Sequence, residues 1–410
     1  MTESETARRS NELSCLVALR DAGELTITEL MVATGLSRPT ADGIARVLEE
    51  GGAIGSAIRP AQGAGRPARV YRFTADELTA GLEIGRSTVR AVVADRAGVV
   101  IDRREIPRRE PTSDADLEST AAVLDDLEGV IDAVVGDREL AGIGLALPGI
   151  IAEQRVSLSR VLPALNTFDV ASALEERTGA PVRIGNDVKL AGLGEARVGA
   201  GRAASSMLLV WLGRRVSTSV VMDGIVLQGA HGLAGEITAA VGTEWTQGSV
   251  YGAWTWPGGL GALETGQRAV DGDDSARAAL EDYLGDIARP LARLTAMIDP
   301  HLVVISGVLS ESPAPIAPML AEALAERLTV PIVPEVAVAD HGRYSSAIGA
   351  LVTAYDEPAI SGLARWTLPP PTEALLRAAR TETEREEQMM PVTEDQHHSS
   401  PEGGEHGCPP

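Results

Sequence analysis

The stretch from Leu25 to Phe73 constrains the fold most, because a glycine turn separates two short helical segments there. The first segment begins near Leu25 and would pack through its leucine and methionine side chains. The centre, residues 35–40, reads Gly-Leu-Ser-Arg-Pro-Thr. Gly35 can end the first helix in the left-handed conformation, Ser37 can cap a second helix, and Pro39 is tolerated in its first turn. Two helices joined by such a turn form a helix-turn-helix.

The second helix has one apolar face and one polar face. Its apolar residues recur at helical spacing, namely Ala41, Ile44, Val47 and Leu48. The outward face then carries the candidate DNA contacts, which are Ser37, Arg38, Pro39, Thr40 and Arg46. Asp42 and Glu49 make this helix less basic than is usual for a helix that reads DNA.

A β-hairpin is expected directly after the second helix. Residues 53–58 and 69–73 alternate in polarity like two strands, and the loop 59–67 between them carries Arg66 near its tip. An arginine on such a wing can reach a phosphate or a narrow minor groove. The order of turn, cap and wing predicts a winged helix-turn-helix over residues 1–73. The alternative is a helical hairpin and a β-hairpin that serve only for packing.

The distribution of charge decides whether this head can meet DNA. The whole chain carries a net charge of −22, which by itself repels nucleic acid. Residues 1–73, however, hold as many basic as acidic side chains, so the acidity lies behind the head. A neutral head binds DNA modestly and with strong salt dependence, which favours a dimer that docks two heads at once.

The two cysteines and the hydropathy of the sequence indicate the cellular compartment. Cys15 and Cys408 lie near opposite ends of the chain, so neither a disulfide framework nor a cysteine metal cluster is expected. No apolar run has the length of a membrane span, and no apolar core typical of a signal peptide begins the sequence. We expect a cytoplasmic protein without a membrane partner.

Behind the head, strands and helices alternate as in an α/β fold. Residues 1–12 are polar and expected to fray, and the first helix of the head is expected over residues 11–20. In a first lobe, residues 74–198, strands are expected at 81–85, 89–95, 99–107, 141–147 and 182–184, with helices at 114–135 and 170–179. In a second lobe, residues 199–366, strands are expected at 206–211, 217–223 and 302–307, with one or two helices at 275–299, and the segments 316–328, 335–339 and 345–355 complete the lobe. Residues 367–410 are polar and Glu-rich, which predicts a disordered acidic tail.

Short motifs in this order resemble the ROK family (repressor, open reading frame, kinase). In the head they are residues 35–40 and 65–68; in the body they are residues 81–85, 147–149, 181–182, 186–187, 223–224, 234–236 and 263–264. The resemblance covers about residues 11–365. It implies a winged helix-turn-helix followed by a two-lobed, actin/hexokinase-like (ribonuclease H-like) ATPase fold. Some members of the family are sugar kinases, and those with a winged head are mostly transcriptional regulators of sugar metabolism.

The nucleotide motifs of the family's kinases are altered here. Glu83 stands where they have Asp, and Arg86 stands at a glycine of the first phosphate loop. The second phosphate loop, residues 213–219, contains two arginines and a β-branched residue instead of glycines, although backbone N–H groups cradle phosphate best without side chains. These arginines either are solvated and paired with acids or bind an anion themselves. A Gly-Gly pair is reduced to Ser306-Gly307. We expect ATP binding to be lost, and no cofactor.

The residues that correspond to the family's sugar-contacting positions are partly retained. The resemblance puts Asp187 at the place of the kinases' catalytic base. Because ATP binding is expected to be lost, Asp187 would be a vestigial base that only accepts a hydrogen bond from a sugar hydroxyl. No catalytic residue is therefore assigned. It matches Asn186, Glu236 and Glu264 to sugar-contacting positions, and such groups suit the hydroxyls of a hexose. The alternative is that these are solvated polar residues at loop ends. Lys189 replaces a second Asn, and its cation is expected to pair with Asp187 or with an acidic ligand.

The sequence favours a DNA-binding transcriptional regulator, namely a repressor. The family resemblance implies that it controls genes of carbohydrate metabolism. Its partners would be a double-stranded DNA operator and a sugar or sugar-phosphate effector, and it would act as a homodimer or homotetramer. The effector has to bind the two states of the protein with different affinity to act at all. Two alternatives stay open: an active sugar kinase with an appended head, and a regulator whose body is only a dimerisation scaffold.

The zinc ligands of the family are replaced, which gives a first prediction. Thr238-Ala239 replaces Gly-His, and the loop 254–262 contains no cysteine. Because zinc needs about four such ligands, we expect Trp245, Trp254 and Trp256 to fill this region by packing, and no metal to be bound. Elemental analysis of the purified protein should find zinc far below one ion per chain. Stoichiometric zinc would show this expectation to be wrong.

Overall fold

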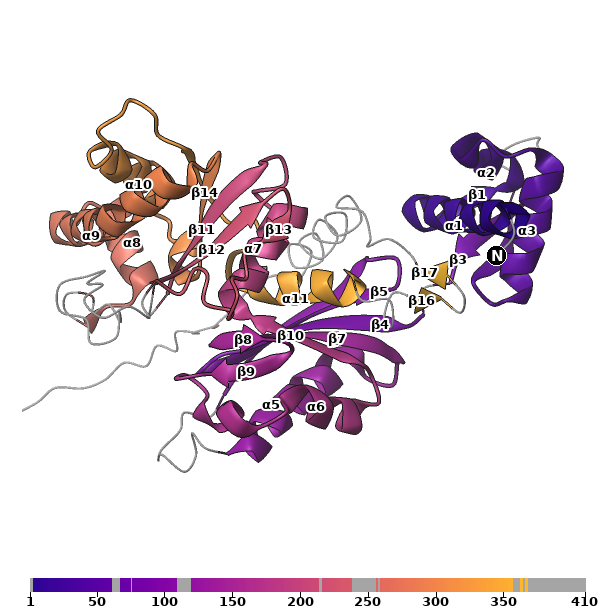
Figure 1. Ribbon diagram of the computed structural model, residues 1–410, viewed down its shortest axis with the longest axis horizontal. Helices are drawn as coiled ribbons and strands as arrows, with labels where there is room; N and C mark the ends of the chain where they lie inside the picture. The colour runs from indigo at the N-terminus through magenta and orange to yellow at the C-terminus, as the bar shows by residue number, and fades with distance from the viewer. Residues whose placement is uncertain are drawn as a thin grey trace, which may run out of the picture.

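The computed structural model describes residues 3–60, 67–74, 76–108, 119–213, 216–237, 256, 259–356, 362–363 and 366–367. Three parts follow one another along the chain, a helical head and two α/β lobes (Figure 1). The expected tail lies outside the described residues except for Thr367, which ends a two-residue strand. No helix within the described ranges combines the length and apolar character that crossing a membrane requires.

The head packs three helices on a small sheet. Its elements are α1 (Glu3–Ala22), β1 (Glu24–Thr26), α2 (Ile27–Thr34), α3 (Arg38–Glu50), β2 (Ile54–Arg59) and β3 (Ala68–Phe73). The sheet has the order β1-β3-β2 with antiparallel pairs. Leu16, Leu30 and Leu48 come from the three helices and are fully buried in one cluster. This burial of apolar side chains holds the head together.

Local chemistry in the head differs from the expectation in three places. Helix α1 begins at Glu3, well before residue 11, and an Arg8–Glu12 pair spans one of its early turns. Residues 24–26 form a strand, and Thr26 then starts α2 with a capping box that Glu29 completes. Ser37 occupies the cap position of α3, but its hydroxyl bonds the Thr40 hydroxyl at 2.8 Å and makes no bond to the backbone.

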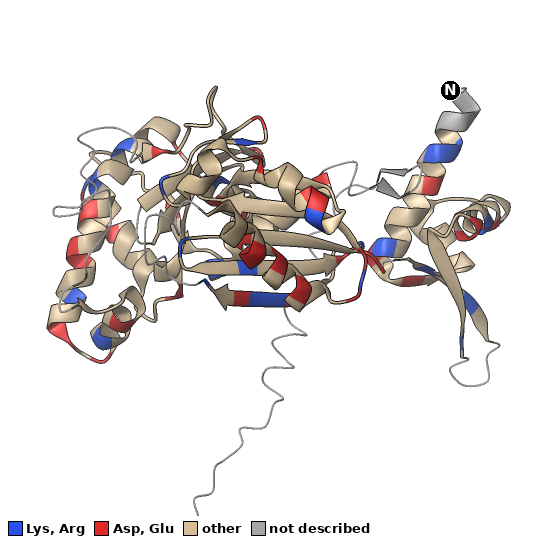
Figure 2. Ribbon diagram, turned by 90° about the horizontal axis from the view of Figure 1, so that it is seen from below, with Lys and Arg blue, Asp and Glu red and all other residues tan. Residues whose placement is uncertain are grey.

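Other expectations for the head are confirmed. Gly35 adopts the left-handed conformation with φ 71°, which a side chain would strain. Pro39 lies in the first turn of α3. Ala41, Ile44 and Leu48 of the expected stripe are buried, whereas Val47 is half-buried. Ala45, outside the expected stripe, is buried as well. The hairpin β2–β3 follows as expected (Figure 2).

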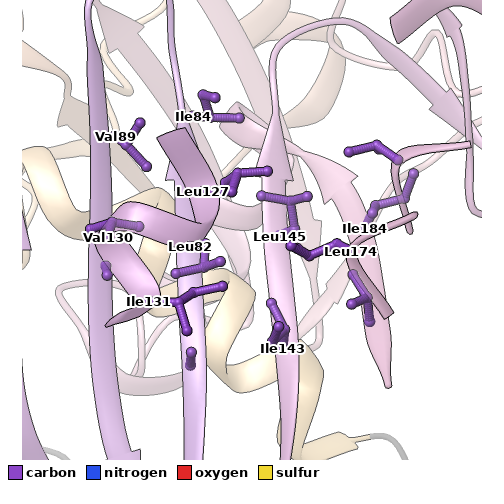
Figure 3. Packing of buried hydrophobic residues seen from close by; sticks show 14 of the residues in the cluster. Leu82, Ile84, Val89, Leu127, Val130, Ile131, Ile143, Leu145, Leu174 and Ile184 are labelled. Atoms are coloured by element: carbon purple, nitrogen blue, oxygen red, sulfur yellow. The ribbon is translucent and has the colours of Figure 1, made fainter. Parts of the chain in front are cut away.

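The first lobe is a mixed sheet covered by helices. Its strands are β4 (Leu78–Ile84), β5 (Thr88–Asp95), β6 (Val100–Pro107), β7 (Leu140–Leu147) and β10 (Val182–Asn186), in the order β10-β7-β4-β5-β6. Helices α5 (Thr120–Val135) and α6 (Val170–Thr178) join the sheet in one apolar cluster, in which Leu127 faces Leu82 and Leu145 (Figure 3). A small hairpin, β8 (Ile150–Ala152) and β9 (Arg155–Leu158), and a 3₁₀ turn, η1 (Pro163–Thr167), follow β7. Strands β4, β7 and β10 are parallel, so their carboxyl ends meet at one edge.

The second lobe repeats this plan. Its strands are β11 (Ser206–Leu212), β12 (Val216–Met222), β13 (Ile225–Val226), β14 (Leu302–Ser306) and β15 (Glu335–Val338), in the order β13-β12-β11-β14-β15. Its helices are α8 (Ala262–Val270), α9 (Asp274–Ile298) and α10 (Ile316–Ala325), with the 3₁₀ turns η5 (Val308–Glu311) and η6 (Gly342–Tyr344). Strands β16 (Gly362–Leu363) and β17 (Trp366–Thr367) pair near the end of the described chain.

Two helices, α7 (Asp187–Val198) and α11 (Ser345–Asp356), join the lobes. Helix α11 packs on β4, β7 and α7, and α7 also packs on β12 of the second sheet (Figure 1). Sequence order suggested that α11 completes the second lobe, but the helix lies on the first sheet. Helix α7 was not predicted, because it is buried on nearly all sides and shows no polar face at helical spacing.

The crossing of α7 and α11 depends on glycine. A Cβ at Gly349 would lie 1.7 Å from the carbonyl oxygen of Leu190, so the two backbones are in direct contact. We predict that Gly349→Ala lowers the free energy of unfolding by about 3 kcal/mol, because the helices must separate. Chemical denaturation measures this.

Gly129→Ala is the matched control for this substitution. Gly129 also lies inside a helix, α5, but a Cβ there meets nothing within 4 Å. Alanine should stabilise that helix by about 0.5–1 kcal/mol. Equal effects of the two substitutions would contradict the close crossing.

Candidate functional site

The candidate site lies where β10 ends and α7 begins. Asn186 is the last residue of β10 and the cap of α7, since its Oδ1 accepts a bond from the backbone N–H of Lys189 at 2.9 Å. Its Nδ2 donates to the carbonyl of Gly149 at 2.9 Å and lies 3.4 Å from Oε1 of Glu236. The carboxyl edge of parallel strands is where α/β folds place ligand sites. The structure therefore brings Asn186 and Glu236 from two lobes into one site.

Asp187 is the first residue of α7 and the most perturbed acid of this site. Burial raises the pKa of Asp187 to about 8, and the negative charges of Glu83 and Glu236 add to this effect. Its Oδ1 accepts one bond, from the backbone N–H of Val188 at 2.9 Å. A carboxyl group with a pKa near neutrality can accept or give a proton to a bound hydroxyl.

Lys189, the only lysine of the chain, has a structural role that the sequence did not indicate. It is buried, and its Nζ donates to the carbonyls of Gly232 at 2.7 Å and Gln228 at 3.2 Å. The expected pair with Asp187 is therefore not formed; the ammonium group instead holds the loop that precedes Glu236. Burial raises the pKa of Glu236, although the charge of Lys189 opposes this shift.

Glu264 does not join the other sugar-site candidates. It lies on α8 with 53% of its side chain exposed, and it pairs with Arg268 of the same helix at 3.0 Å. Among the described contacts, one joins Asn186 to Glu236 and Asp187 adjoins Asn186 in the chain, whereas none joins Glu264 to these residues.

At the positions of the family's nucleotide motifs, Glu83 and Ser306 contact other residues of this protein. Glu83 is buried and pairs with Arg90 at 3.1 Å, while Arg86 is exposed on the turn after β4. Ser306 is buried and donates to the Ser345 hydroxyl at 3.3 Å. The two arginines at 214 and 215 lie outside the described residues.

The region expected to replace the zinc site is described only at Trp256. Its ring lies 5.0 Å from that of Tyr283, centroid to centroid, and packs on the core of the second lobe. Trp245, Trp254 and Thr238-Ala239 lie outside the described residues.

The head presents the expected polar face. The exposed residues at the start and along the outer side of α3 are Ser37, Arg38, Pro39, Thr40 and Arg46. Arg38 is 66% exposed and lies 3.8 Å from Asp42, which is a loose contact. Arg66 lies outside the described residues.

The described arginines of the hairpin are paired within the head. Arg69 of β3 bonds Glu49 of α3 at 2.7 Å, and Ser56 of β2 donates to the same carboxylate. On the other side, Glu24 of β1 accepts from both Arg72 and Arg59, at 2.6 and 3.1 Å. Glu49, which the sequence suggested only as an unfavourable charge, thus fixes the hairpin against α3. No sequence pattern indicates these pairs, because they join residues far apart in the chain.

Comparison with known proteins identifies the family. Residues 79–240 and 248–357 match the sequence profile of the ROK family. Because this match covers more than half of the chain, the chain belongs to the ROK family.

Three similar proteins show how far the likeness extends. A glucokinase of Halalkalibacterium halodurans is 34% identical over 167 residues, which span 40% of this chain and about half (49%) of that protein. The N-acetylgalactosamine kinase AgaK of Shewanella sp. is 27% identical and covers 66% of this chain and 94% of its own length. A solved ROK family transcriptional regulator, a homologue of the E. coli MLC protein, aligns with 92% of this chain and 99% of its own, at 18% identity and a TM-score of 0.61. At that identity the likeness shows a common fold.

The raised pKa of Asp187 predicts a pH dependence of stability. Its carboxyl keeps a proton in the folded state up to about pH 8, but loses it near pH 4 in the unfolded chain. The free energy of unfolding should therefore fall as the pH rises from about 4 to 8, and level off above that range. Asp187→Asn should remove up to about 1.4 kcal/mol per pH unit from this slope. Urea denaturation at several pH values measures it, and an unchanged slope would contradict the assignment.

Proposed function

We propose that this chain is a DNA-binding transcriptional regulator, acting as a repressor, of genes for carbohydrate metabolism. One observation carries the proposal: the first turn and outer side of α3 are polar and exposed, while the opposite face is buried in the core of the head. A helix held in this way on a head with a hairpin is suited to the major groove. The arrangement of α3 and the hairpin supports the proposal that the head is a winged helix-turn-helix.

The ion pairs of the head define which groups meet DNA. Arg59, Arg69 and Arg72 are held by Glu24 and Glu49, so they position the hairpin before any DNA arrives. Arg38 and Arg46 on α3 are proposed to contact phosphates or bases, and so is Arg66, which lies outside the described residues. Since so few cations face DNA, the protein acts as a homodimer or homotetramer on a double-stranded operator.

The site at the start of α7 is proposed to bind the effector, a sugar. Asn186, Asp187 and Glu236 offer amide and carboxyl groups to hydroxyls, and Glu83 adds a further negative charge nearby. This concentration of acids favours an uncharged sugar over a sugar phosphate. Glu264 of the second lobe is a fourth proposed contact, and a sugar held by Asn186 of the first lobe and Glu236 of the second would move one lobe relative to the other. Such a movement, transmitted to the paired heads, would change operator affinity.

The body is proposed to bind sugar without phosphorylating it. The substituted positions Glu83 and Arg86, together with buried Ser306, oppose nucleotide binding. An active sugar kinase is the second candidate, and one specific observation favours it: the pKa of Asp187 is raised to about 8, which makes its carboxylate, once deprotonated, a stronger base than an ordinary Asp. The glucokinase and N-acetylgalactosamine kinase relatives are consistent with it. A body that serves only as a dimerisation scaffold is the third.

Arginine substitutions test the DNA-binding surface. Arg38→Ala and Arg46→Ala should each weaken operator binding by about 1–3 kcal/mol if they contact bases, or lower the salt slope by about one if they contact phosphates. Fluorescence anisotropy with an operator selected from random DNA measures both.

Arg289→Ala is the matched control on the body. Arg289 is 58% exposed and pairs within its own helix with Asp286, much as Arg38 faces Asp42. It should leave DNA affinity unchanged. Unchanged affinity in both head variants would count against the proposed function.

A thermal-shift screen against sugars and sugar phosphates, with and without Mg-ATP, separates the three candidates. A ligand at about a hundred times its dissociation constant stabilises the folded state by about 2.7 kcal/mol. We expect a shift with a neutral sugar that ATP does not alter. A shift that requires ATP would favour the kinase, and the absence of any shift would favour the scaffold.

A further inference from the structure

An ion pair links two turns that follow neighbouring strands of the second sheet. Glu311 ends η5, which directly follows β14 of the second sheet, and Arg343 lies in η6, which leads into α11 on the first sheet. The Glu311 carboxylate accepts from the backbone N–H and from Nε of Arg343, both at 2.9 Å, and also contacts its Nη2. Burial opposes ionisation of this acid, but the bonds from Arg343 keep the pKa of Glu311 below its usual range.

The pair continues into the first sheet as a chain of alternating charges. Arg343 lies 3.5 Å from Oε1 of Glu105 on β6, and the same carboxylate accepts from Nε of Arg90 on β5 at 2.6 Å. Arg90 in turn bonds both carboxylate oxygens of Glu83 on β4, at 3.1 and 3.2 Å. Glu105 is thus held between one arginine of the sheet and one arginine of η6.

The turn η6 is fixed to the first lobe at a second point. Arg103 of β6 stacks over the ring of Tyr344, with 5.7 Å from the guanidinium carbon to the ring centroid. Since η6 follows β15 of the second sheet, the Arg343–Glu105 contact and this stacking are the steps that cross between the lobes, and Glu311 holds Arg343 in place for them.

The far end of the chain is at the candidate site. Glu83 is buried, and its charge is one reason why the pKa of Asp187 is raised. A change in the position of Glu83 or Arg90 therefore alters the electrostatic environment of Asp187. The chain connects the spacing between the lobes to the acids at the start of α7.

We propose that the chain Glu83–Arg90–Glu105–Arg343–Glu311 is a latch that sets the opening between the two lobes and couples it to the site at the start of α7. The latch goes beyond the proposed function, because it concerns the geometry of the body whether or not the head binds DNA. An isolated surface pair contributes little, but a partly buried fork that shares its members with other pairs is already ordered and holds its geometry.

Hydrogen exchange of the full chain tests the latch without knowledge of the effector. In Arg343→Gln and in Glu311→Gln, we expect amides of residues 308–311 and of residues 187–189 to exchange about fivefold faster than in the unsubstituted protein. The double variant should exchange no faster than either single variant, because both break the same link. Faster exchange confined to residues 308–311, or no change at all, would overturn the proposal.

Arg177→Gln is the matched control. Arg177 bonds Asp125 and Glu128 at 3.0 and 2.6 Å, and is 34% exposed against 41% for Arg343, but all three of its groups belong to the first lobe. It should leave both segments unchanged. An equal acceleration in this variant would also overturn the latch.

Salt provides a readout that needs no substitution. At 1 M KCl, where charges are screened beyond about 3 Å, both segments of the unsubstituted protein should exchange faster. Arg343→Gln should show little further response to salt. Exchange that is insensitive to salt in the unsubstituted protein would contradict a latch made of ion pairs.

Discussion

The backbone contact between α7 and α11 is the constraint on which the body depends. Gly349 admits the carbonyl of Leu190, and Gly81 and Gly144 of the first sheet admit carbonyls of α11 at positions where a Cβ would clash. Four backbones therefore meet with hardly any side chain between them. Because α7 also packs on β12, this contact fixes the distance from the first sheet to the second.

The two ends of α7 carry acids with opposite roles. Glu195, near its end, is fully buried and accepts from the Ser345 hydroxyl and from the backbone N–H groups of Ala200, Asp340 and His341. That carboxylate is satisfied and ties the chain after β15 to the helix. Asp187, at the start, accepts from the backbone N–H groups of Val188 and of its own residue, and its carboxyl is proposed to meet a ligand. One helix thus joins the lobes at one end and carries the site at the other.

In the head and in the body alike, acids that pair with arginines hold neighbouring elements together. Glu24 and Glu49 hold the hairpin by its arginines, and Glu105 and Glu311 hold the lobes by theirs. The chain has a net charge of −22, so acidic side chains outnumber arginines. Most described arginines form ion pairs within the protein. In this way an acidic protein keeps its parts in register with few basic side chains.

The sequence by itself determined the head and most strands, because their signals are local: the glycine turn at Gly35, the proline after it, and apolar residues at fixed spacing. It also pointed to Asn186 and Asp187, which adjoin a strand end. Only the tertiary structure decided that α7 is a helix, that Lys189 bonds two carbonyls, and that Glu236 meets Asn186 from the other lobe. These features depend on which surfaces meet across the lobes. Contacts between residues distant in the chain leave no periodic signal in one sequence.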